Sequence, residues 1–396
     1  MSQKERCDLL LNQAGLTLVE LLVSLVVVGL LATAVFSFFL NTSQSVSQQS
    51  ANGEMWQRGR NAMAIMRQAI ESAGYGLPSY SQCPNGVVGI NNASTQGGGA
   101  LVPITASVQS SGSGYSLSNA SGGTYAFSTV IGGGSFGGAP ATTLINHPGN
   151  SSGIFVNNTA PLNPGDLALI APQGGGTCLL GQITNVEGKG TLNCSTGTST
   201  GNGTLKTAGH IEFNSGNHGS CFQANPTQIF SLLTGTAGTP SLTNANLYDL
   251  GSQDFLFESF AITENPAGSS TPTLTMTQYT GLQASTPTPQ PLASGVVDIQ
   301  MQYGLGTNGS VQSWVSPTNY TPSATQDIVA VQIAMLIRST QYLPNSLSPA
   351  SFNVLGQTYT VPTTGGPGCL QGNCRHYQYH LFQSVIPVRN GIWGNQ

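Results

Sequence analysis

The chain contains few charged residues. Only 6% of its 396 residues are Asp, Glu, Lys or Arg, and the formal net charge is −4 at pH 7. A surface that binds nucleic acid needs clustered lysine and arginine side chains. The sequence has no such patch, so it argues against nucleic acid as a partner. The small net charge of the chain also excludes a long acidic tail.

The chain also lacks a convincing catalytic motif. Residues 133–137 match the G-x-S-x-G pattern around Ser135, but in a glycine-rich run with no following helix. With 51 glycines in the chain, such a match is expected by chance. Residues 304–309 match G-x-G-x-x-G, yet a turn-like segment ending in Pro317 follows where a dinucleotide site needs a helix. We predict a hairpin loop there, no enzyme activity and no cofactor.

No metal site is expected either. Cys374, His376 and His380 suggest zinc by residue type, but positions four apart on an extended strand lie about 13 Å apart. Zinc bonds are about 2 Å long, so the two histidines cannot share an ion without a bend. We interpret both as solvent-facing. The turn at Thr307 and Asn308 has no acid that would hold calcium.

The most informative segment is an apolar run over residues 16–40. As a helix it would be roughly 37 Å long, which exceeds the hydrocarbon core of about 30 Å. Lys4 and Arg6 precede it and favour a cytoplasmic N-terminus. An ordinary secretory signal peptide and a plain signal anchor are alternatives. Neither explains Glu20, an acid inside the run whose burial is costly unless it is paired.

The residues from Gly15 to Val23, GLTLVELLV, resemble the class III signal of type IV pilins and type II secretion pseudopilins. The resemblance implies that a membrane peptidase cuts after Gly15 and that Leu16 becomes the N-terminus, which is usually N-methylated. The family usually has phenylalanine there, so Leu16 is a departure. The resemblance also implies that Glu20 pairs, in a filament, with the N-terminal amine of a neighbouring subunit.

The predicted helix continues beyond the membrane segment. Residues 41–73 contain no proline, and small or apolar side chains recur on one narrow stripe of the helix. The stripe consists of Met55, Gly59, Ala62, Met66, Ala69 and Ala73. Glycine and proline over residues 74–78 supply a stop. We expect the stripe to pack against the chain's own globular part.

After Pro78 the pattern becomes that of strands. Alternation over 295–303, 327–338 and 374–389 predicts half-buried antiparallel strands, the first with Val297 and Ile299 on one face. Shorter candidates are 126–131, 166–170, 179–186, 228–233 and 255–263. Residues rich in Gly, Ser, Thr and Asn predict surface loops at 84–125, 132–152 and 195–208.

These patterns predict an α+β, pilin-like fold. A leader peptide would occupy residues 1–15, and a transmembrane and packing helix residues 16–76. A β-rich periplasmic or extracellular domain would occupy residues 77–396, with a long helix against an antiparallel sheet and polar insertions at about 84–250.

The C-terminal half carries a second resemblance. The helix end at 67–76, the strands at 295–304 and 327–339, and the closing strand at 382–390 are similar to those of the minor pilin PilW. Shorter similarities lie at 165–170 and 182–184. The resemblance implies a minor pilin that primes type IV pilus assembly in a minor-pilin complex at the tip.

The resemblance also implies the partners and the location. The partners would be the prepilin peptidase, the inner-membrane assembly machinery, other minor pilins and the major pilin, the pilins being bound through the N-terminal helix. The chain would cross the inner membrane before assembly, with its N-terminus in the cytoplasm, and would enter the periplasmic or extracellular pilus afterwards. Two alternatives stay open: a J-like minor pseudopilin of a type II secretion system, and a tip adhesin whose insertions bind a surface or a glycan.

Seven cysteines are present, and cleavage would remove Cys7. An even number in an exported chain predicts disulfide bonds, and six cysteines allow fifteen pairings. Proximity in the sequence favours Cys369 with Cys374 and Cys178 with Cys194. This choice leaves Cys83 with Cys221.

Overall fold

The computed structural model describes most of the chain after the leader. The described residues are 17–78, 82–84, 87–91, 94–99, 102–109, 123–134, 139–146, 153–193, 198–200, 209–213, 244–252, 256–264, 271–280, 287–307, 309–323, 325–363, 369 and 373–389. They divide into two compact units, residues 1–54 and 55–396, and the helix α2 (Leu18–Ser72) contributes to both.

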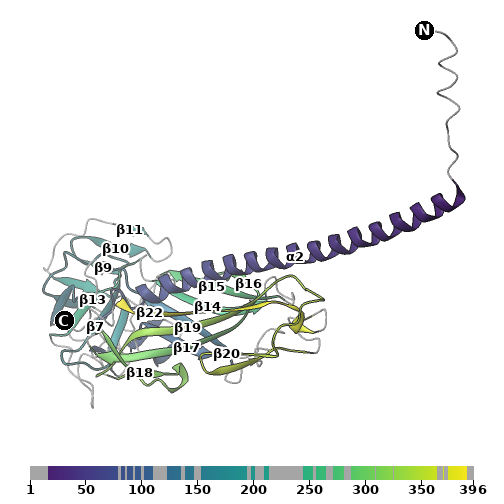
Figure 1. Ribbon diagram of the computed structural model, residues 1–396. Coiled ribbons are helices and arrows are strands. Elements are labelled where there is room, and N and C mark those ends of the chain that lie inside the picture. The colour runs from purple at the N-terminus through teal and green to yellow at the C-terminus, as the bar shows by residue number, and fades with distance from the viewer. Residues whose placement is uncertain are drawn as a thin grey trace, which may run out of the picture. The chain divides into compact units, whose positions relative to one another are not determined.

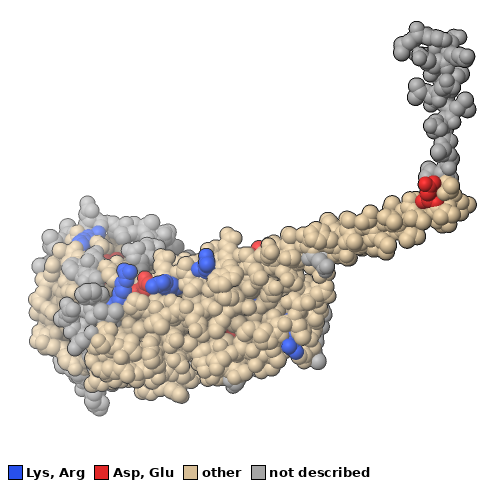
Figure 2. Space-filling model, viewed as in Figure 1, with Lys and Arg blue, Asp and Glu red and all other residues tan. Residues whose placement is uncertain are grey.

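The first unit is the N-terminal part of α2, which is 55 residues long in all. By length and composition this helix could cross a membrane. Between Glu20 and Glu54 the sequence has no charged residue, and Figure 2 shows no Lys or Arg along this stretch. The long apolar helix that the sequence predicts is therefore present.

The helix ends where the glycines predict. Gly74 and Gly76 adopt φ angles of 79° and 75°, a left-handed conformation that glycine adopts without strain. The N–H of Gly74 donates to the carbonyl of Val130 at 2.7 Å, and the N–H of Gly132 donates to that of Tyr75 at 2.7 Å. These bonds fasten the helix end to a strand of the globular unit.

Two antiparallel sheets form the centre of the second unit. The four-stranded sheet has the order β18-β17-β19-β22 and the five-stranded sheet β16-β15-β14-β4-β3. The first comprises β17 (Val296–Thr307), β18 (Ser310–Val315), β19 (Asp327–Arg338) and β22 (Tyr379–Pro387). The second comprises β3 (Ile104–Val108), β4 (Tyr125–Ile131), β14 (Leu256–Glu264), β15 (Pro272–Thr280) and β16 (Gln290–Ser294).

Residues 55–73 pack against both of these sheets in one apolar core (Figure 1). The helix contributes its predicted stripe, with Met66 and Ala62 fully buried, and the sheets contribute side chains such as Phe127 and Ile333. The α+β fold with a long helix on antiparallel sheets is thus confirmed.

A third sheet of eleven strands has its own core. Its order is β11-β10-β9-β12-β6-β5-β13-β7-β8-β1-β2. Its strands are β1 (Val87–Asn91), β2 (Ser94–Gly99), β5 (Thr142–Asn146), β6 (Gly153–Val156), β7 (Leu167–Ala171), β8 (Cys178–Gln182), β9 (Asn185–Val186), β10 (Gly190–Asn193), β11 (Thr198–Thr200), β12 (His210–Glu212) and β13 (Asn246–Asp249). The pair β1–β8 is parallel, a departure from the antiparallel pattern.

The second face of the four-stranded sheet is also covered. The hairpin of β20 (Ser351–Val354) and β21 (Gln357–Thr360) and the segment around Cys374 pack there. Asp298 and Gln300, which the alternation places on an open polar face, are only 0% and 2% exposed, and Gln300 Nε2 donates to the carbonyl of Gly123, just before β4, at 2.7 Å.

Some sequence predictions were wrong. The segments predicted as loops contain β1, β2, β3, β5 and β11. Their own sequence patterns indicate strands only weakly, and pairing with a neighbouring strand stabilises the strand conformation. A bulge between Val296 and Asp298 turns Val297 away from Ile299, onto the opposite face. The predicted strand at 228–233 lies outside the described residues.

Candidate functional site

Thr17 and Glu20 form a capping box at the start of α2. The backbone N–H and the hydroxyl of Thr17 each lie 3.2 Å from Glu20 Oε2, and the N–H of Glu20 donates to Thr17 Oγ1 at 3.3 Å. This reciprocal arrangement satisfies backbone N–H groups that the first turn leaves unpaired. Sequence reasoning missed it, although Thr-x-x-Glu before an apolar run is a recognisable signal.

The apolar surface of the first unit is solvent-exposed throughout the described residues 18–40. Leu18 is 76% exposed and Phe38 is 72% exposed. The hydroxyls in this stretch do not break the apolar character, because Ser24, Thr33 and Ser37 each donate to a carbonyl three residues earlier at 2.9 Å. A helix whose polar groups are satisfied internally suits a lipid or protein-packed environment.

Gly15 and Leu16, the predicted cleavage and methylation residues, lie outside the described residues. Glu20 is described, and its carboxylate already has a partner in Thr17 of its own chain. Its pairing with a neighbour's amine stays a prediction.

In the second unit, close contacts bind α2 to β22. A Cβ atom at Gly59 would overlap the ring of Phe382, so glycine allows the helix and the strand to approach. Trp56 lies beside His380 with ring centroids 3.9 Å apart. Glu71 is 2.8 Å from Arg67 Nε and 3.5 Å from Arg389 Nη2, which links the helix to the residues after β22.

The sequence suggested that the two histidines near the C-terminus face solvent. In the structure both contact other residues. His376 lies in a short 3₁₀ turn, η4 (Cys374–His376), and its Nδ1 is 2.8 Å from the carbonyl of Ser346. His380 packs on Trp56, and burial lowers the pKa of its imidazole. The predicted strand therefore begins at Tyr379 rather than at Cys374. Within the described ranges no group of three metal-binding side chains occurs.

Two disulfide bonds are described. Cys83 is bonded to Cys178 with a Cα–Cα distance of 5.4 Å, so the predicted pairing of Cys178 with Cys194 is wrong, and that of Cys83 with Cys221 is wrong with it. The physical reason is the parallel pairing of β1 with β8, which places Val87 opposite Cys178 and brings the chain before β1 close. Cys194 and Cys221 lie outside the described residues.

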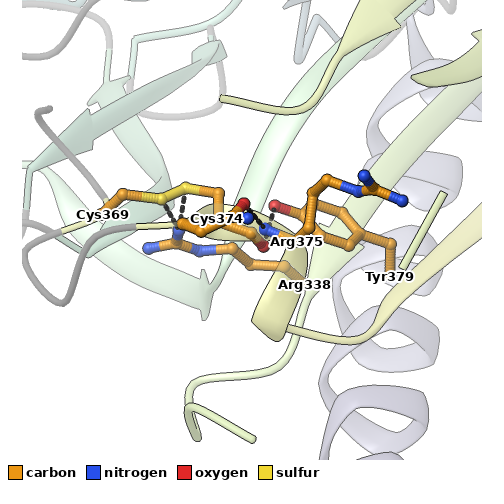
Figure 3. Close-up of a disulfide and its surroundings, with 6 residues drawn as sticks. Arg338, Cys369, Cys374, Arg375 and Tyr379 are labelled. Atoms are coloured by element: carbon orange, nitrogen blue, oxygen red, sulfur yellow. Dashed lines mark hydrogen bonds between the residues drawn. A yellow bond between two sulfur atoms is a disulfide. The ribbon is translucent and has the colours of Figure 1, made fainter. Parts of the chain in front are cut away.

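The second disulfide joins Cys369 to Cys374, the expected pair, with a Cα–Cα distance of 5.5 Å. The buried Arg338 lies against it (Figure 3). Its Nη1 is 3.4 Å from Cys374 Sγ and 3.7 Å from Cys369 Sγ, and its guanidinium carbon is 4.4 Å from the centre of the Tyr377 ring. The Tyr379 hydroxyl donates to the Cys374 carbonyl at 3.2 Å, so the loop is fastened to β22.

The two motifs that resembled catalytic sites add nothing to this picture. Ser135 lies outside the described residues. Residues 304–307 are the end of β17 and pair with β18, with Thr307 opposite Ser310, which confirms the predicted hairpin.

Comparison with known proteins gives two family matches. The family described as "Type IV Pilus-assembly protein W" matches residues 259–390, and the prokaryotic N-terminal methylation motif matches residues 10–36. The first match covers the four-stranded sheet and most of β14, and the second covers the capping box and much of the apolar helix. The methylation motif and the apolar helix fit a membrane-anchored pilin.

The type IV-like pilin TTHA1219 from Thermus thermophilus is a similar solved structure, 14% identical, over 35% of this chain and 69% of that chain, with a TM-score of 0.21. No curated protein matches. The family matches point to a structural protein that interacts with other pilus components. The two family matches together support a pilin that is similar to the PilW family of type IV pilus-assembly proteins.

Proposed function

We propose that this chain is a minor pilin that primes type IV pilus assembly within a minor-pilin complex at the filament tip. It acts by helix packing and not by catalysis. The observation that supports the proposal is the exposed apolar helix with one acid at its start, in the same chain as the PilW match. Exposed apolar side chains over a whole helix need lipid or neighbouring helices around them.

Glu20 sets the axial register in this proposal. In the single chain its carboxylate is held by Thr17, which is enough for an exposed helix end. In a filament the same carboxylate lies among apolar helices, where a charge is costly unless an opposite charge meets it. Cleavage after Gly15 supplies that charge as the α-amine of Leu16 on a neighbouring subunit.

Cleavage gives the first prediction. Intact-mass measurement of the chain recovered from sheared pili should show a polypeptide that begins at Leu16, with or without one methyl group. A Gly15→Leu variant should keep its full length, because the peptidase requires glycine before the cut. Recovery of a wild-type chain that begins at Met1 would refute the proposed processing.

Loss of the acid gives the second prediction. A Glu20→Leu chain should reach the membrane at the wild-type level but enter pili at least about tenfold less often, because the neighbour's α-amine would stay buried without a partner, which costs about 3–5 kcal/mol. The readout is immunoblotting of sheared pili against membranes. Glu54→Gln, the next acid along the helix, serves as the control and should assemble normally. Equal incorporation of both variants would contradict a register role for Glu20.

Deleting the gene separates the alternatives. Loss of surface pili with normal protein secretion supports the minor-pilin role, whereas loss of secretion with normal pili identifies a J-like pseudopilin instead. Normal pili with reduced attachment would identify an adhesin. The prediction for the minor-pilin role is the first of these outcomes.

A further inference from the structure

The Cys369–Cys374 disulfide lies against a buried positive charge. Arg338 is the last residue of β19 and is only 4% exposed. Its Nη1 is 3.4 Å from Cys374 Sγ and 3.7 Å from Cys369 Sγ (Figure 3). Because an arginine guanidinium is not deprotonated in proteins, both sulfurs lie within hydrogen-bonding reach of a permanent cation.

The surroundings of the disulfide strengthen the effect of this charge. Both cysteines belong to an apolar cluster on the second face of the four-stranded sheet, with side chains such as Val354 and Val361. Electrostatic interactions are stronger in such a low-dielectric environment than in water. A disulfide sulfur is neutral and accepts hydrogen bonds only weakly, whereas a thiolate carries a full negative charge. Opening the disulfide would therefore replace a weak contact of Arg338 with a charge pair.

The Cys83–Cys178 disulfide has different surroundings. It is buried in an apolar cluster with Leu77 and Leu169, and Cys178 Sγ lies 3.4 Å from the carbonyl oxygen of Gln82. Apolar burial and the partial negative charge of a carbonyl oxygen both disfavour an anion. The structure therefore favours a thiolate at Cys369 and Cys374 and opposes one at Cys83 and Cys178.

Cys374 is also fastened by bonds other than its disulfide. Its N–H donates to the Pro362 carbonyl at 3.0 Å, and its carbonyl accepts the Tyr379 hydroxyl at 3.2 Å. The turn η4 that it begins is capped by Asn373, whose side chain accepts the Arg375 N–H at 2.9 Å. These bonds do not require the disulfide, so it can open while Cys374 keeps its place on the sheet.

We propose that Cys369–Cys374 is a redox-labile disulfide that opens reversibly by exchange with a dithiol, and that the charge of Arg338 makes it so. One thiolate of the dithiol attacks a sulfur of the pair, the Cys369–Cys374 bond breaks, and a mixed disulfide forms. The second sulfur of the dithiol then displaces the protein sulfur. The dithiol leaves as a cyclic disulfide and gives two electrons to the protein. The protein keeps one thiol and one thiolate beside Arg338, and one proton passes to solvent.

This arrangement changes the reduction equilibrium because it stabilises the reduced form. A disulfide whose reduced form is stabilised is more easily reduced at equilibrium. The inference does not depend on the proposed role in pili, although the site lies within residues 259–390, which match the PilW family.

Equilibration with dithiothreitol tests the proposal. The full wild-type chain in detergent is held at graded ratios of reduced to oxidised dithiothreitol, free thiols are alkylated, and each cysteine is assigned by peptide mass spectrometry. Cys369–Cys374 should be half reduced at a ratio at least about tenfold lower than Cys83–Cys178, which corresponds to about 30 mV. Equal ratios for the two disulfides would overturn the proposal.

Two arginine variants separate the charge from other properties of the loop. Arg338→Met removes the charge beside the sulfurs and should raise the ratio for Cys369–Cys374 at least about tenfold. Arg375→Met is the matched control, because its guanidinium points away from the sulfurs (Figure 3) and its Nε donates to the Ser348 carbonyl at 2.9 Å. The control should leave the ratio unchanged, and the ratio for Cys83–Cys178 checks the fold of both variants. Equal effects of the two variants would refute the role of Arg338.

The pH dependence of reduction tests the thiolate in the wild-type chain itself. Because opening releases one proton, the ratio at half reduction of Cys369–Cys374 should rise about tenfold for each unit by which the pH falls from about 7.5 to 6. The ratio for Cys83–Cys178 should stay nearly constant, since its reduced form and dithiothreitol both keep their thiol protons over this range. A ratio for Cys369–Cys374 that does not change with pH would contradict a thiolate beside Arg338.

Discussion

Removing the Cys83–Cys178 disulfide should lower the free energy of unfolding by about 4–5 kcal/mol, the larger of the two losses expected for the disulfides that the structure describes. The bond closes a loop with a sequence separation of 95 residues, and a longer loop leaves the unfolded chain more conformations to lose. Both cysteines are fully buried in an apolar cluster with Leu77 and Leu169. The double variant Cys83→Ala, Cys178→Ala, measured by urea unfolding of the full chain in detergent, checks this value.

The second disulfide provides a matched control. Cys369 and Cys374 are separated by only 5 residues, so the double variant Cys369→Ala, Cys374→Ala should lose about 2 kcal/mol on the same chain-entropy argument. Equal losses for the two double variants would contradict that argument and would assign the effect to local packing around Arg338 instead.

The long helix could be predicted because its signals are local. An uninterrupted apolar run, a stripe at helical spacing and a Gly-x-Gly stop lie next to one another in the sequence, and none depends on a distant partner. The same holds for β19, whose predicted range of 327–338 agrees with the observed strand. Strong alternation over many residues determines such a strand largely without its neighbours.

The remaining strands depend on partners that no local pattern reveals. β2, with three glycines in its six residues, is a strand because β1 lies beside it. The partner of Cys178 could not be found from proximity in sequence, since the parallel pairing of β1 with β8 brings Cys83 from a separation of 95 residues. A single bulge after Val296 reversed the expected face of Val297, because alternation counts residues and a bulge adds one.

The candidate site was predicted in part. Glu20 could be singled out because an acid in an apolar run is costly, but its bonds to Thr17 were not predicted, although both residues lie in the same first turn.

Asp298 is a buried acid whose charge opposes folding. Its residue is 0% exposed, Gln300 Nε2 donates to its Oδ1 at 2.9 Å, and its Oδ2 has no hydrogen-bond partner among the residues that the structure describes. Burial raises the pKa of this carboxyl from 3.8 to about 6. The folded chain therefore holds the proton more strongly than the unfolded chain does, and the protonated form is the one that stabilises the fold.

The pH dependence of the free energy of unfolding follows from this upward shift of the Asp298 pKa. The stabilisation from the protonated carboxyl is complete below about pH 4 and is lost as the pH rises through about 6, a change of about 3 kcal/mol in the free energy of unfolding. Asp166, whose pKa is also raised to about 6, should add a change of the same sign over the same range.

Asp298→Asn should therefore raise the free energy of unfolding at pH 7.5 by about 1–3 kcal/mol and leave it almost unchanged at pH 4. The amide keeps an oxygen for Gln300 and removes the buried charge, while its NH₂ group limits the gain because it needs an acceptor. Urea unfolding at the two pH values measures both effects, with Asp327→Asn at the less buried start of β19 as the control. A loss of stability that is equal at both pH values would contradict the prediction, because it would mean that the carboxylate's hydrogen bonds outweigh the cost of burying its charge.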